Sequence, residues 1–282
     1  MDRHLNREAM AEECILRFEN VSLLFDGDDA PALDRVSFQL MAGETIVLFG
    51  AAGSGKTVLL KLAVGLLRPA SGRIFLFGRD VTSLNEQDWY QMRAQAGILF
   101  QEGGLFDSMT IEENVSYPLL NQKLLSLPPE EVHNRVDEVL QFVGLPQTMD
   151  KFPSELSGGM RRRVGIARAT VTHPKLLLYD SPTAGLDPIT ANRIIALLIK
   201  EREMRNTASM IVTHRFQDGH MLATFRYNPQ TDKVQQVKPD ERIELHTRFF
   251  VMQEGRLAFE GTEEELDNTT DPYISKFTMQ RV

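Results

Sequence analysis

The stretch that decides the fold is Gly50-Ala51-Ala52-Gly53-Ser54-Gly55-Lys56-Thr57. It matches the pattern G-x-x-x-x-G-K-[ST] of a phosphate-binding loop. The apolar run before it, residues 45–49, predicts a buried strand, and the run after it, residues 58–64, predicts a helix. This order points backbone N–H groups and the positive end of a helix at an anion. A chance glycine-rich turn is the alternative, and the flanking strand and helix argue against it.

The residue types in this loop predict how a nucleotide would be held. Glycines allow the backbone to approach phosphate oxygens closely, because they carry no Cβ. Lys56 would reach the β- and γ-phosphates, and the Thr57 hydroxyl would ligate Mg²⁺.

Composition sets the broad class. The chain has 282 residues, of which 42% are hydrophobic and 25% charged, as in ordinary globular proteins. The formal net charge of −8 argues against a nucleic-acid partner. The single cysteine excludes an intramolecular disulfide and fits a reducing compartment. The charged first residues do not resemble a signal peptide, and the apolar runs are too short to span a membrane, so we expect any membrane link to go through a partner.

The pattern of apolar residues predicts an alternating α/β chain with a helical insertion. Strands are expected at residues 14–18, 36–40, 73–78, 96–100, 175–180 and 209–213, and a helix at 190–202. Thr110 and Glu113 have the spacing of a helix capping box, and residues 130–143 have helical periodicity that ends at Gly144. The segment between about 102 and 170 therefore reads as mainly helical.

A second anion site is predicted at Ser157-Gly158-Gly159. Ser157 is a good N-cap residue, and the two glycines would expose N–H groups at a helix start. The arginine run that follows, residues 161–163, could equally be a solvated helix face.

Polar side chains at expected strand ends are the remaining candidates. Asp180 ends an apolar strand, where a carboxylate could hold Mg²⁺. His214 follows the next strand and either faces the nucleotide or is structural. Phe25 precedes a turn-rich segment and could stack on a base or belong to the core.

Together these pieces resemble the ATP-binding cassette (ABC) ATPases of membrane transporters. The loop at 50–57 looks like their Walker A motif, Gln101 like the Q-loop glutamine, and residues 156–160 like the signature Leu-Ser-Gly-Gly-Gln with methionine in the last place. Asp180 looks like the Walker B aspartate, residues 184–187 like the D-loop, and His214 like the switch histidine. Phe25 falls where the family has its base-stacking aromatic residue.

This resemblance implies a fold and a division of the chain. The fold would be α/β: a P-loop NTPase with a RecA-like mixed or parallel sheet core, an antiparallel β subdomain and an inserted α-helical subdomain. One ABC ATPase domain would cover residues 14–266, with the core at about 14–101 and 170–266 and the helical subdomain at about 102–169. Residues 267–282 would form a C-terminal tail.

The resemblance also implies a site for ATP and Mg²⁺ at which two subunits meet. Catalytic roles fall on Lys56, Gln101, Ser181 and His214, and metal binding on Thr57, Gln101 and Asp180. The nucleotide contacts would be Phe25, Gly50, Ala51, Ala52, Gly53, Ser54, Gly55, Lys56, Thr57, Val58, Ser157, Gly158, Gly159 and Asp187. In this family the phosphate loop of one subunit and the signature loop of its twin hold one ATP between them.

Partners follow from the same resemblance. A second ATPase subunit, most simply an identical copy, and an integral-membrane permease are implied, on the cytoplasmic face of the cell membrane and without nucleic acid. The permease would insert into a groove near Gln101, and Leu105, Phe106 and Met109 would line this groove or belong to the core.

A finer resemblance concerns the cargo. Residues 100–110, the Leu-Ser-Gly-Gly-Met signature with its arginines, and residues 254–262 are similar to the ATPases of Mla- and Mce-type bacterial lipid transporters. This implies a phospholipid or other hydrophobic cargo and a periplasmic MCE-type lipid-binding partner.

The chain departs from the family at Ser181, where a glutamate normally follows the Walker B aspartate and polarises the attacking water. A general base contributes about 10²–10⁴-fold to a rate, so we expect slow hydrolysis with ATP binding retained. Glu102 or Asp187 could substitute, or His214 and water could suffice. A hydrolysis-impaired regulatory module and a soluble ABC protein outside transport are the alternative functions.

A second departure is the long segment at 216–247. Its turn-rich centre, residues 227–232, predicts an extra hairpin, which is either a surface elaboration or a docking edge for a partner. For the tail from residue 271 onward we expect a short helix that packs on the partner subunit.

Overall fold

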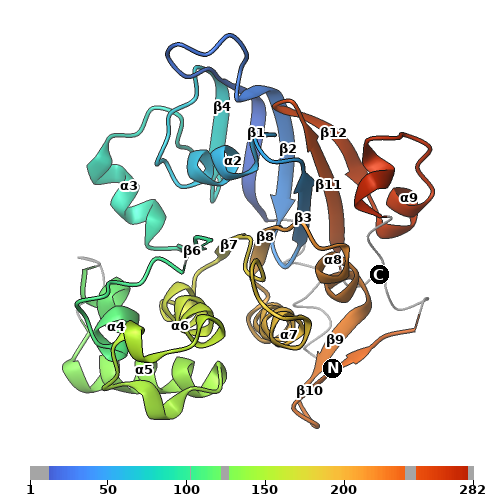
Figure 1. Ribbon diagram of the computed structural model, residues 1–282. Coiled ribbons are helices and arrows are strands. Elements are labelled where there is room, and N and C mark those ends of the chain that lie inside the picture. The colour runs from blue at the N-terminus through green and yellow to red at the C-terminus, as the bar shows by residue number, and fades with distance from the viewer. Residues whose placement is uncertain (1–12, 102, 122–126, 239–245, 279–282) are drawn as a thin grey trace, which may run out of the picture.

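The computed structural model describes residues 13–278 except 102, 122–126 and 239–245. Its largest sheet has six strands, with α6 (Gly158–Thr170), α7 (Pro188–Arg205) and α8 (Phe216–Thr224) on one side and α2 (Lys56–Ala63) on the other (Figure 1). A separate four-stranded sheet lies beyond α2. This is the α/β architecture, with an antiparallel sheet and inserted helices, that the sequence predicts.

The six-stranded sheet has the order β12-β11-β3-β8-β7-β6. Its members are β3 (Thr45–Gly50), β6 (Ala96–Leu99), β7 (Leu176–Asp180), β8 (Ala208–Val212), β11 (Thr247–Gln253) and β12 (Arg256–Gly261). The pairs from β11 to β6 are parallel, and β12 pairs antiparallel with β11.

The apolar sequence of the central strands reflects burial on both faces. In β3, Ile46 and Leu48 point into the core shared with α2, whereas Val47 and Phe49 point into the core shared with the helices on the other side. The parallel strands all end at one edge of the sheet, so the residues after β3, β7 and β8 come together there.

The four-stranded antiparallel sheet has the order β2-β1-β4-β5. It consists of β1 (Cys14–Leu23), β2 (Leu33–Met41), β4 (Ser71–Leu76) and β5 (Arg79–Asp80). Its inner face packs against α2 and the near face of the large sheet, for example through Phe38, whose ring centroid lies 5.6 Å from that of Phe250 in β11. This sheet therefore holds α2, and with it the phosphate loop, from one side.

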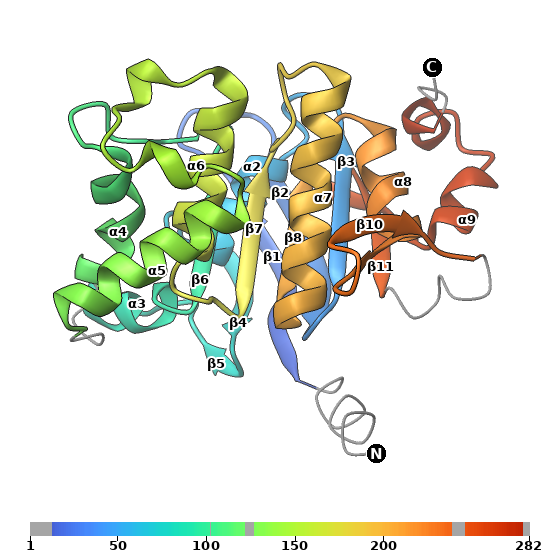
Figure 2. The same ribbon diagram turned by 90° about the horizontal axis from the view of Figure 1, so that it is seen from below.

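Three helices, α4 (Ile111–Asn121), α5 (Pro129–Phe142) and α6, lie between β6 and β7 in sequence and group at one end of the molecule (Figure 2). The capping box is confirmed at the start of α4: the Thr110 N–H donates to Glu113 Oε2 at 2.7 Å, and the Glu113 N–H donates to Thr110 Oγ1 at 3.2 Å. Short 3-10 turns at Pro146–Thr148 and Pro153–Glu155 connect α5 to α6.

Three further helices give little signal in the sequence. They are α3 (Glu86–Arg93), α8 and α9 (Glu263–Asp267). In α3 the packing rests on Trp89 and Met92, which are buried, while the rest of the helix is polar. All three are short, so their helical periodicity is too brief to read from the sequence.

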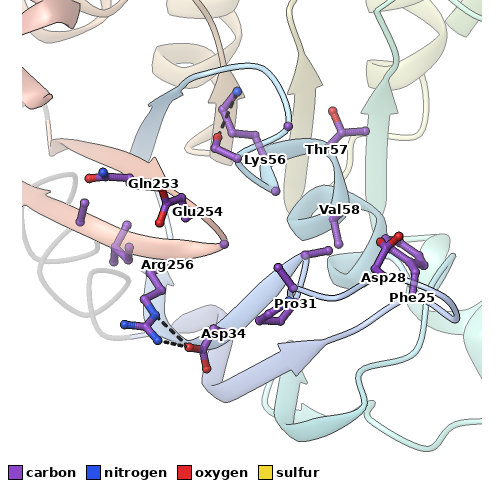
Figure 3. Close-up of a pocket in the computed structure, with 18 residues that line it drawn as sticks. Phe25, Asp28, Pro31, Asp34, Lys56, Thr57, Val58, Gln253, Glu254 and Arg256 are labelled. Atoms are coloured by element: carbon purple, nitrogen blue, oxygen red, sulfur yellow. Dashed lines mark hydrogen bonds and ion pairs between the residues drawn. The ribbon is translucent and has the colours of Figure 1, made fainter.

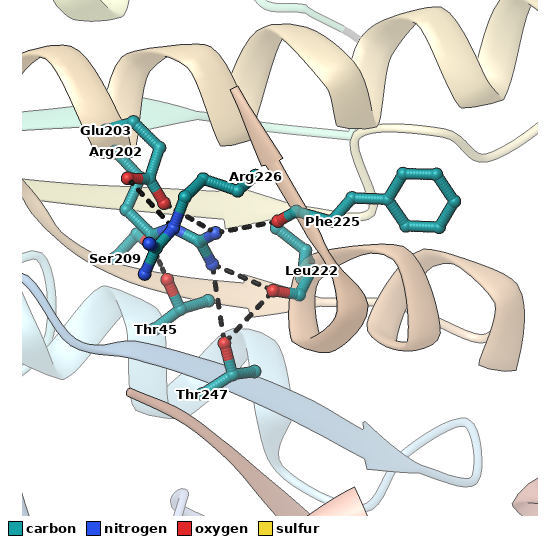
Figure 4. Close-up of polar contacts among 8 residues, drawn as sticks. All are labelled: Thr45, Arg202, Glu203, Ser209, Leu222, Phe225, Arg226 and Thr247. Carbon is teal, nitrogen blue, oxygen red and sulfur yellow. Dashed lines mark hydrogen bonds and ion pairs between the residues drawn. The ribbon is translucent and has the colours of Figure 1, made fainter. Parts of the chain in front are cut away.

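The extra hairpin is confirmed. Strands β9 (Phe225–Asn228) and β10 (Lys233–Gln236) pair antiparallel. Its base is held by the buried guanidinium of Arg202 in α7, which donates to Leu222 O at 2.8 Å and to Phe225 O at 3.2 Å (Figure 4). A single side chain thus satisfies carbonyls at the end of α8 and the beginning of β9.

The tail packs on its own chain. A 3-10 turn at Ile274–Phe277 brings the Phe277 ring within 6.0 Å of the Phe49 ring, measured between centroids. The expected terminal helix is therefore present as a single turn, and in this chain it lies beneath the phosphate loop. Among the described helices, none combines the length and the apolar character needed to cross a bilayer.

Candidate functional site

The loop between β3 and α2 can form its tight curve only with glycine at two positions. Gly50 has φ 151° and Gly55 has φ 101°. A Cβ on Gly50 would lie 2.6 Å from Met252 O, and a Cβ on Gly55 would lie 2.5 Å from Ala32 O. Gly55 is the N-cap of α2 and offers no side chain to the first N–H groups, which are left for a ligand.

The Lys56 side chain lies inside this curve. Its ammonium group donates to Gly50 O at 2.9 Å and to Ala51 O at 2.7 Å. It also lies 3.3 Å from Ser54 Oγ (Figure 3). Burial lowers the pKa of Lys56, and the nearby Asp180 carboxylate opposes this shift. A phosphate would offer the ammonium group a better partner than neutral carbonyls do.

Two metal-binding candidates meet at the end of β7. The Thr57 hydroxyl donates to Asp180 Oδ2 at 2.8 Å, across 123 residues of sequence. A hydroxyl and one carboxylate fit Mg²⁺, which keeps several waters and takes its remaining ligands from phosphate oxygens. Within the described residues no group of three or more histidine, cysteine or acidic side chains is arranged to hold a metal ion, so a metal held wholly by such side chains is not indicated there.

A cavity of about 990 Å³ opens beside the loop. Phe25, which is 38% exposed, lines it together with Val58 and the last five loop residues, 53–57. The far wall contains the ion pair of Asp34 and Arg256 (Figure 3). The placement of Phe25 suits a stacking role, which stays a prediction.

His214 follows β8 at the same edge of the sheet. Desolvation lowers its pKa, with a further contribution from Lys56, while Asp180 opposes the shift. The imidazole therefore lies within electrostatic range of both groups and is neutral at neutral pH.

The second anion site lies elsewhere in the chain. Ser157 is the N-cap of α6 and accepts from the Met160 N–H at 3.3 Å, as predicted. Gly158 is exposed and lines a separate hollow of about 520 Å³ that shares no lining residue with the first cavity. Gln101 lines this hollow, and its metal role stays a prediction.

The arginine run is not a plain solvated face. Arg162 is buried and donates to Ala184 O at 3.3 Å, and Arg163 donates to Val143 O at 3.0 Å. These side chains tie α6 to neighbouring loops rather than only facing water.

Ser181 sits in a left-handed backbone conformation, with φ 52°. Its hydroxyl is buried and donates to Asp180 Oδ1 at 3.2 Å. Asp187 is the exposed N-cap of α7, where it accepts from the Thr190 N–H at 3.0 Å, and hydrogen bonds from the Thr190 side chain and backbone lower its pKa. Glu102 lies outside the described residues.

Some residues that complete the site carry no local signal in the sequence. The Tyr273 hydroxyl accepts from the Ala51 N–H at 3.2 Å and donates to Met252 O at 2.9 Å, so the tail supports the phosphate loop. Arg256 and Tyr273 lie more than two hundred residues from their partners Asp34 and Ala51. Only the folded chain brings them there.

Comparison with known proteins agrees with this geometry. Residues 33–184 match the ABC transporter family. The methionine import ATP-binding protein MetN 2 of Bacillus cereus is 39% identical over 71% of this chain and 59% of its own length. MetN of Geobacillus kaustophilus is 35% identical over 78% of this chain and 70% of its own. The chain thus spans somewhat more than half of the first of these relatives.

Solved structures share the fold. The dimeric ATP-binding cassette MJ0796, in a post-hydrolysis state with ADP and Pi, superposes with a TM-score of 0.73 at 25% identity, covering 88% of this chain and 98% of that one. The cbiO1 protein of Clostridium perfringens, part of the ABC transporter complex cbiONQ, gives 0.73 at 28% identity over 96% of each chain. Sequence and fold therefore agree: the chain belongs to the ABC transporter family.

Proposed function

We propose that this chain binds ATP with Mg²⁺ at the loop of residues 50–57 and hydrolyses it as the energising subunit of a membrane transporter. The observation that carries the proposal is the convergence of Lys56, the Thr57 hydroxyl and the Asp180 carboxylate at the uncapped start of α2. Mg²⁺, when bound, would neutralise charge on the phosphates. Lys56 would hold the terminal phosphates, and the α2 N–H groups would receive the others.

The functional unit is a dimer, most simply of two identical chains. The phosphate loop and the Ser157-Gly158-Gly159 corner line separate cavities. Either of them alone would leave one side of a triphosphate open to solvent. If ATP contacts both corners only when two chains meet, it shifts the population toward the closed pair. The contact roles of Gly158, Gly159 and Asp187 belong to this closed state.

Turnover is slow in this proposal because Ser181 cannot act as a general base. A hydroxyl does not take up a proton at neutral pH, and here it already donates to Asp180. Asp187 is a poor substitute, because its cap bond to Thr190 lowers its pKa. His214 follows β8 at the same edge of the sheet, and because its pKa is lowered, its neutral imidazole could accept a proton from water.

Replacing Ser181 tests this idea. Ser181→Glu should raise the ATP turnover of the purified chain, by up to about 10²-fold, because it adds a carboxylate at the edge where Asp180 ends β7. Ser181→Gln is the matched control, since it has the same size and backbone strain without a base. A wild-type rate equal to that of Ser181→Glu would remove the reason to expect slow turnover.

The proposed partner is an integral-membrane permease, which would place the chain on the cytoplasmic face of the membrane. Phe106 and Tyr117, with ring centroids 4.9 Å apart, are exposed beside the loop that follows Gln101. Leu105 packs against the core instead. The groove prediction is therefore best supported for Phe106.

Two cargoes remain as candidates, each favoured by one observation. The motif resemblance favours a phospholipid, with a periplasmic MCE-type protein as a further partner. The MetN relatives are named as methionine importers, which favours a small polar cargo and gives the MCE-type partner no support.

The test is to isolate the chain with its membrane partner and measure ATP turnover in lipid nanodiscs. Stimulation by added methionine together with its binding protein would favour import of an amino acid, and stimulation by a change in lipid composition would favour lipid transport. Recovery of the chain with no membrane protein would contradict the transporter function. The relatives and structures named above are transporter proteins or cassettes, so they lend no weight to a regulatory module or a non-transport protein.

A further inference from the structure

One buried carboxylate near the site has no part in holding phosphate or metal. Asp218 lies in the first turn of α8 and is 0% exposed. Its Oδ2 accepts two short hydroxyl bonds, from Thr183 Oγ1 at 2.5 Å and from Thr213 Oγ1 at 2.7 Å. Asp218 thus joins two side chains that are 30 positions apart in the sequence.

The two threonines belong to the loops that carry the reaction-facing residues. Thr183 follows Ser181 by two positions in the loop after β7, and Thr213 directly precedes His214 after β8. Both are almost completely buried, at 2% and 1% exposure. Neither side chain reaches the nucleotide cavity, so their bonds to Asp218 act on the loops and not on a ligand.

Backbone bonds hold the beginnings of these loops against neighbouring strands. The Ser181 N–H donates to Val212 O at 2.9 Å, and the Thr213 N–H donates to Leu48 O at 3.2 Å. These bonds end where the strands end. Beyond them, the Asp218 carboxylate accepts a hydrogen bond from each of the two turns.

Burying a carboxylate at this position costs free energy, so packing alone does not explain its presence. Burial disfavours the charged form and raises the pKa of Asp218, while the two hydroxyls and the Arg215 guanidinium, 3.2 Å from Oδ1, oppose the shift. An apolar residue of similar size would fill the space without this penalty. What an apolar residue could not do is accept from two hydroxyls on two loops at once.

We propose that Asp218 is a positioning residue that locks the loop after β7 to the loop after β8 and so fixes Asp180 and Ser181 relative to His214. The inference rests on the proposed ATPase function for its effect on rate. Misplacement of reacting groups by about 1 Å can cost roughly 10²-fold in rate. A bond that fixes these two loops relative to each other would therefore have a large effect on the rate of ATP hydrolysis.

Removing one threonine hydroxyl at a time tests the lock, because the buried Asp218 carboxylate then keeps one of its two hydroxyl partners. Thr183→Val and Thr213→Val each keep the side-chain shape and leave Asp218 with one hydroxyl partner. Each should lower kcat about 10-fold or more, with KM changed much less, because Lys56 and the α2 start are untouched. The double variant should be little worse than the worse single one, because both bonds end on one carboxylate. Asp218→Asn, which keeps an acceptor oxygen, should fall between wild type and the single variants.

Thr170→Val is the matched control. Thr170 is also buried, and its hydroxyl donates to Ile166 O at 3.0 Å within α6, so the substitution deletes an equivalent bond that joins no loops. If Thr183→Val and Thr213→Val lower kcat no more than Thr170→Val does, the proposal is overturned.

Hydrogen exchange separates this proposal from the ATPase function. In the nucleotide-free chain, Thr213→Val should speed amide exchange at residues 181–187, and Thr183→Val should speed it at 213–215. Exchange that rises only in the mutated loop would overturn the lock even if turnover fell. If the wild-type chain hydrolyses no ATP, with or without a permease, but the reciprocal exchange changes are seen, the proposed function is wrong and the lock between the loops is still supported.

Discussion

The starts of α2 and α6 are two proposed anion-binding corners of similar composition. α2 begins directly after the glycine-rich loop, α6 begins with two glycines, and each presents N–H groups at the positive end of a helix. At α2 the cap is Gly55, so no side chain competes for these N–H groups. At α6 the Ser157 hydroxyl already accepts one of them.

Their surroundings differ more than their sequences do. The α2 corner has a buried ammonium group inside it and a carboxylate beside it, so it can neutralise a triphosphate and its metal within one chain. The α6 corner is exposed, and Arg161 beside it donates to Leu156 O at 2.8 Å. In the proposed function, the α2 corner would therefore bind the nucleotide within one chain, and the α6 corner would complete its binding when a second chain brings the nucleotide to it.

The largest difference between the two corners is expected at Lys56, which has no counterpart at the start of α6. Lys56→Met should lower ATP turnover by about 10²–10³-fold, because it removes the charge aimed at the terminal phosphates. Lys61→Met removes the same charge from the last turn of α2 and should have little effect. The measurement is steady-state phosphate release, and equal rates for the two variants would contradict a special role for the α2 corner.

Gly158→Asp should separate the two corners. A Cβ at Gly158 meets nothing within 4 Å, and an acidic residue at a helix start stabilises the helix by about 0.3–1 kcal/mol. The chain should therefore fold well and bind ATP at α2 with unchanged affinity, yet fail to pair, because the new carboxylate repels the phosphates.

Sedimentation with ATP and Mg²⁺, in a background that does not hydrolyse, measures the pairing. Gly158→Asn serves as the uncharged control. Normal ATP-dependent pairing of the aspartate variant would mean that the α6 corner does not contact the nucleotide.

Gly159→Ala and Gly158→Ala compare the stability of the α6 corner at two neighbouring positions. A Cβ at this position would lie 2.7 Å from Thr190 Cγ2 on α7, so the two helices would have to move apart or Thr190 would have to rotate. We expect a loss of about 1–2 kcal/mol in the free energy of unfolding, as for an overpacked core. Gly158→Ala, in open space, should be neutral or slightly stabilising in the same urea titration.

The smallest effect is expected for the cap itself. Ser157→Ala should cost about 1 kcal/mol, because the Met160 N–H loses its acceptor. Ser154→Ala, at an exposed position in the preceding turn, is the control. A cost near zero would show that water replaces the cap, and the exposed α6 corner would then be more open to a ligand than its hydrogen bond suggests.

Much of the fold was predictable because it depends on local patterns. The loop at Gly50–Thr57 with its flanking strand and helix, the capping box at Thr110, the Ser157 cap and the extra hairpin all follow from short-range chemistry, and the structure confirms each. The short helices α3 and α8 were not predictable, since their stability comes from packing of a few residues such as Trp89 rather than from periodicity.

Sequence alone determined the chemistry at each strand end: a lysine and a threonine after β3, an aspartate after β7 and a histidine after β8. The tertiary structure decided which of these meet. It brought Thr57 to Asp180 and His214 within range of Lys56, left Gln101 in another hollow, placed Tyr273 against the phosphate loop and joined Thr183 to Thr213 through Asp218. The reason is physical: hydrogen bonds and charges act over a few ångströms, and only the packing of the parallel sheet sets those distances for residues far apart in the chain.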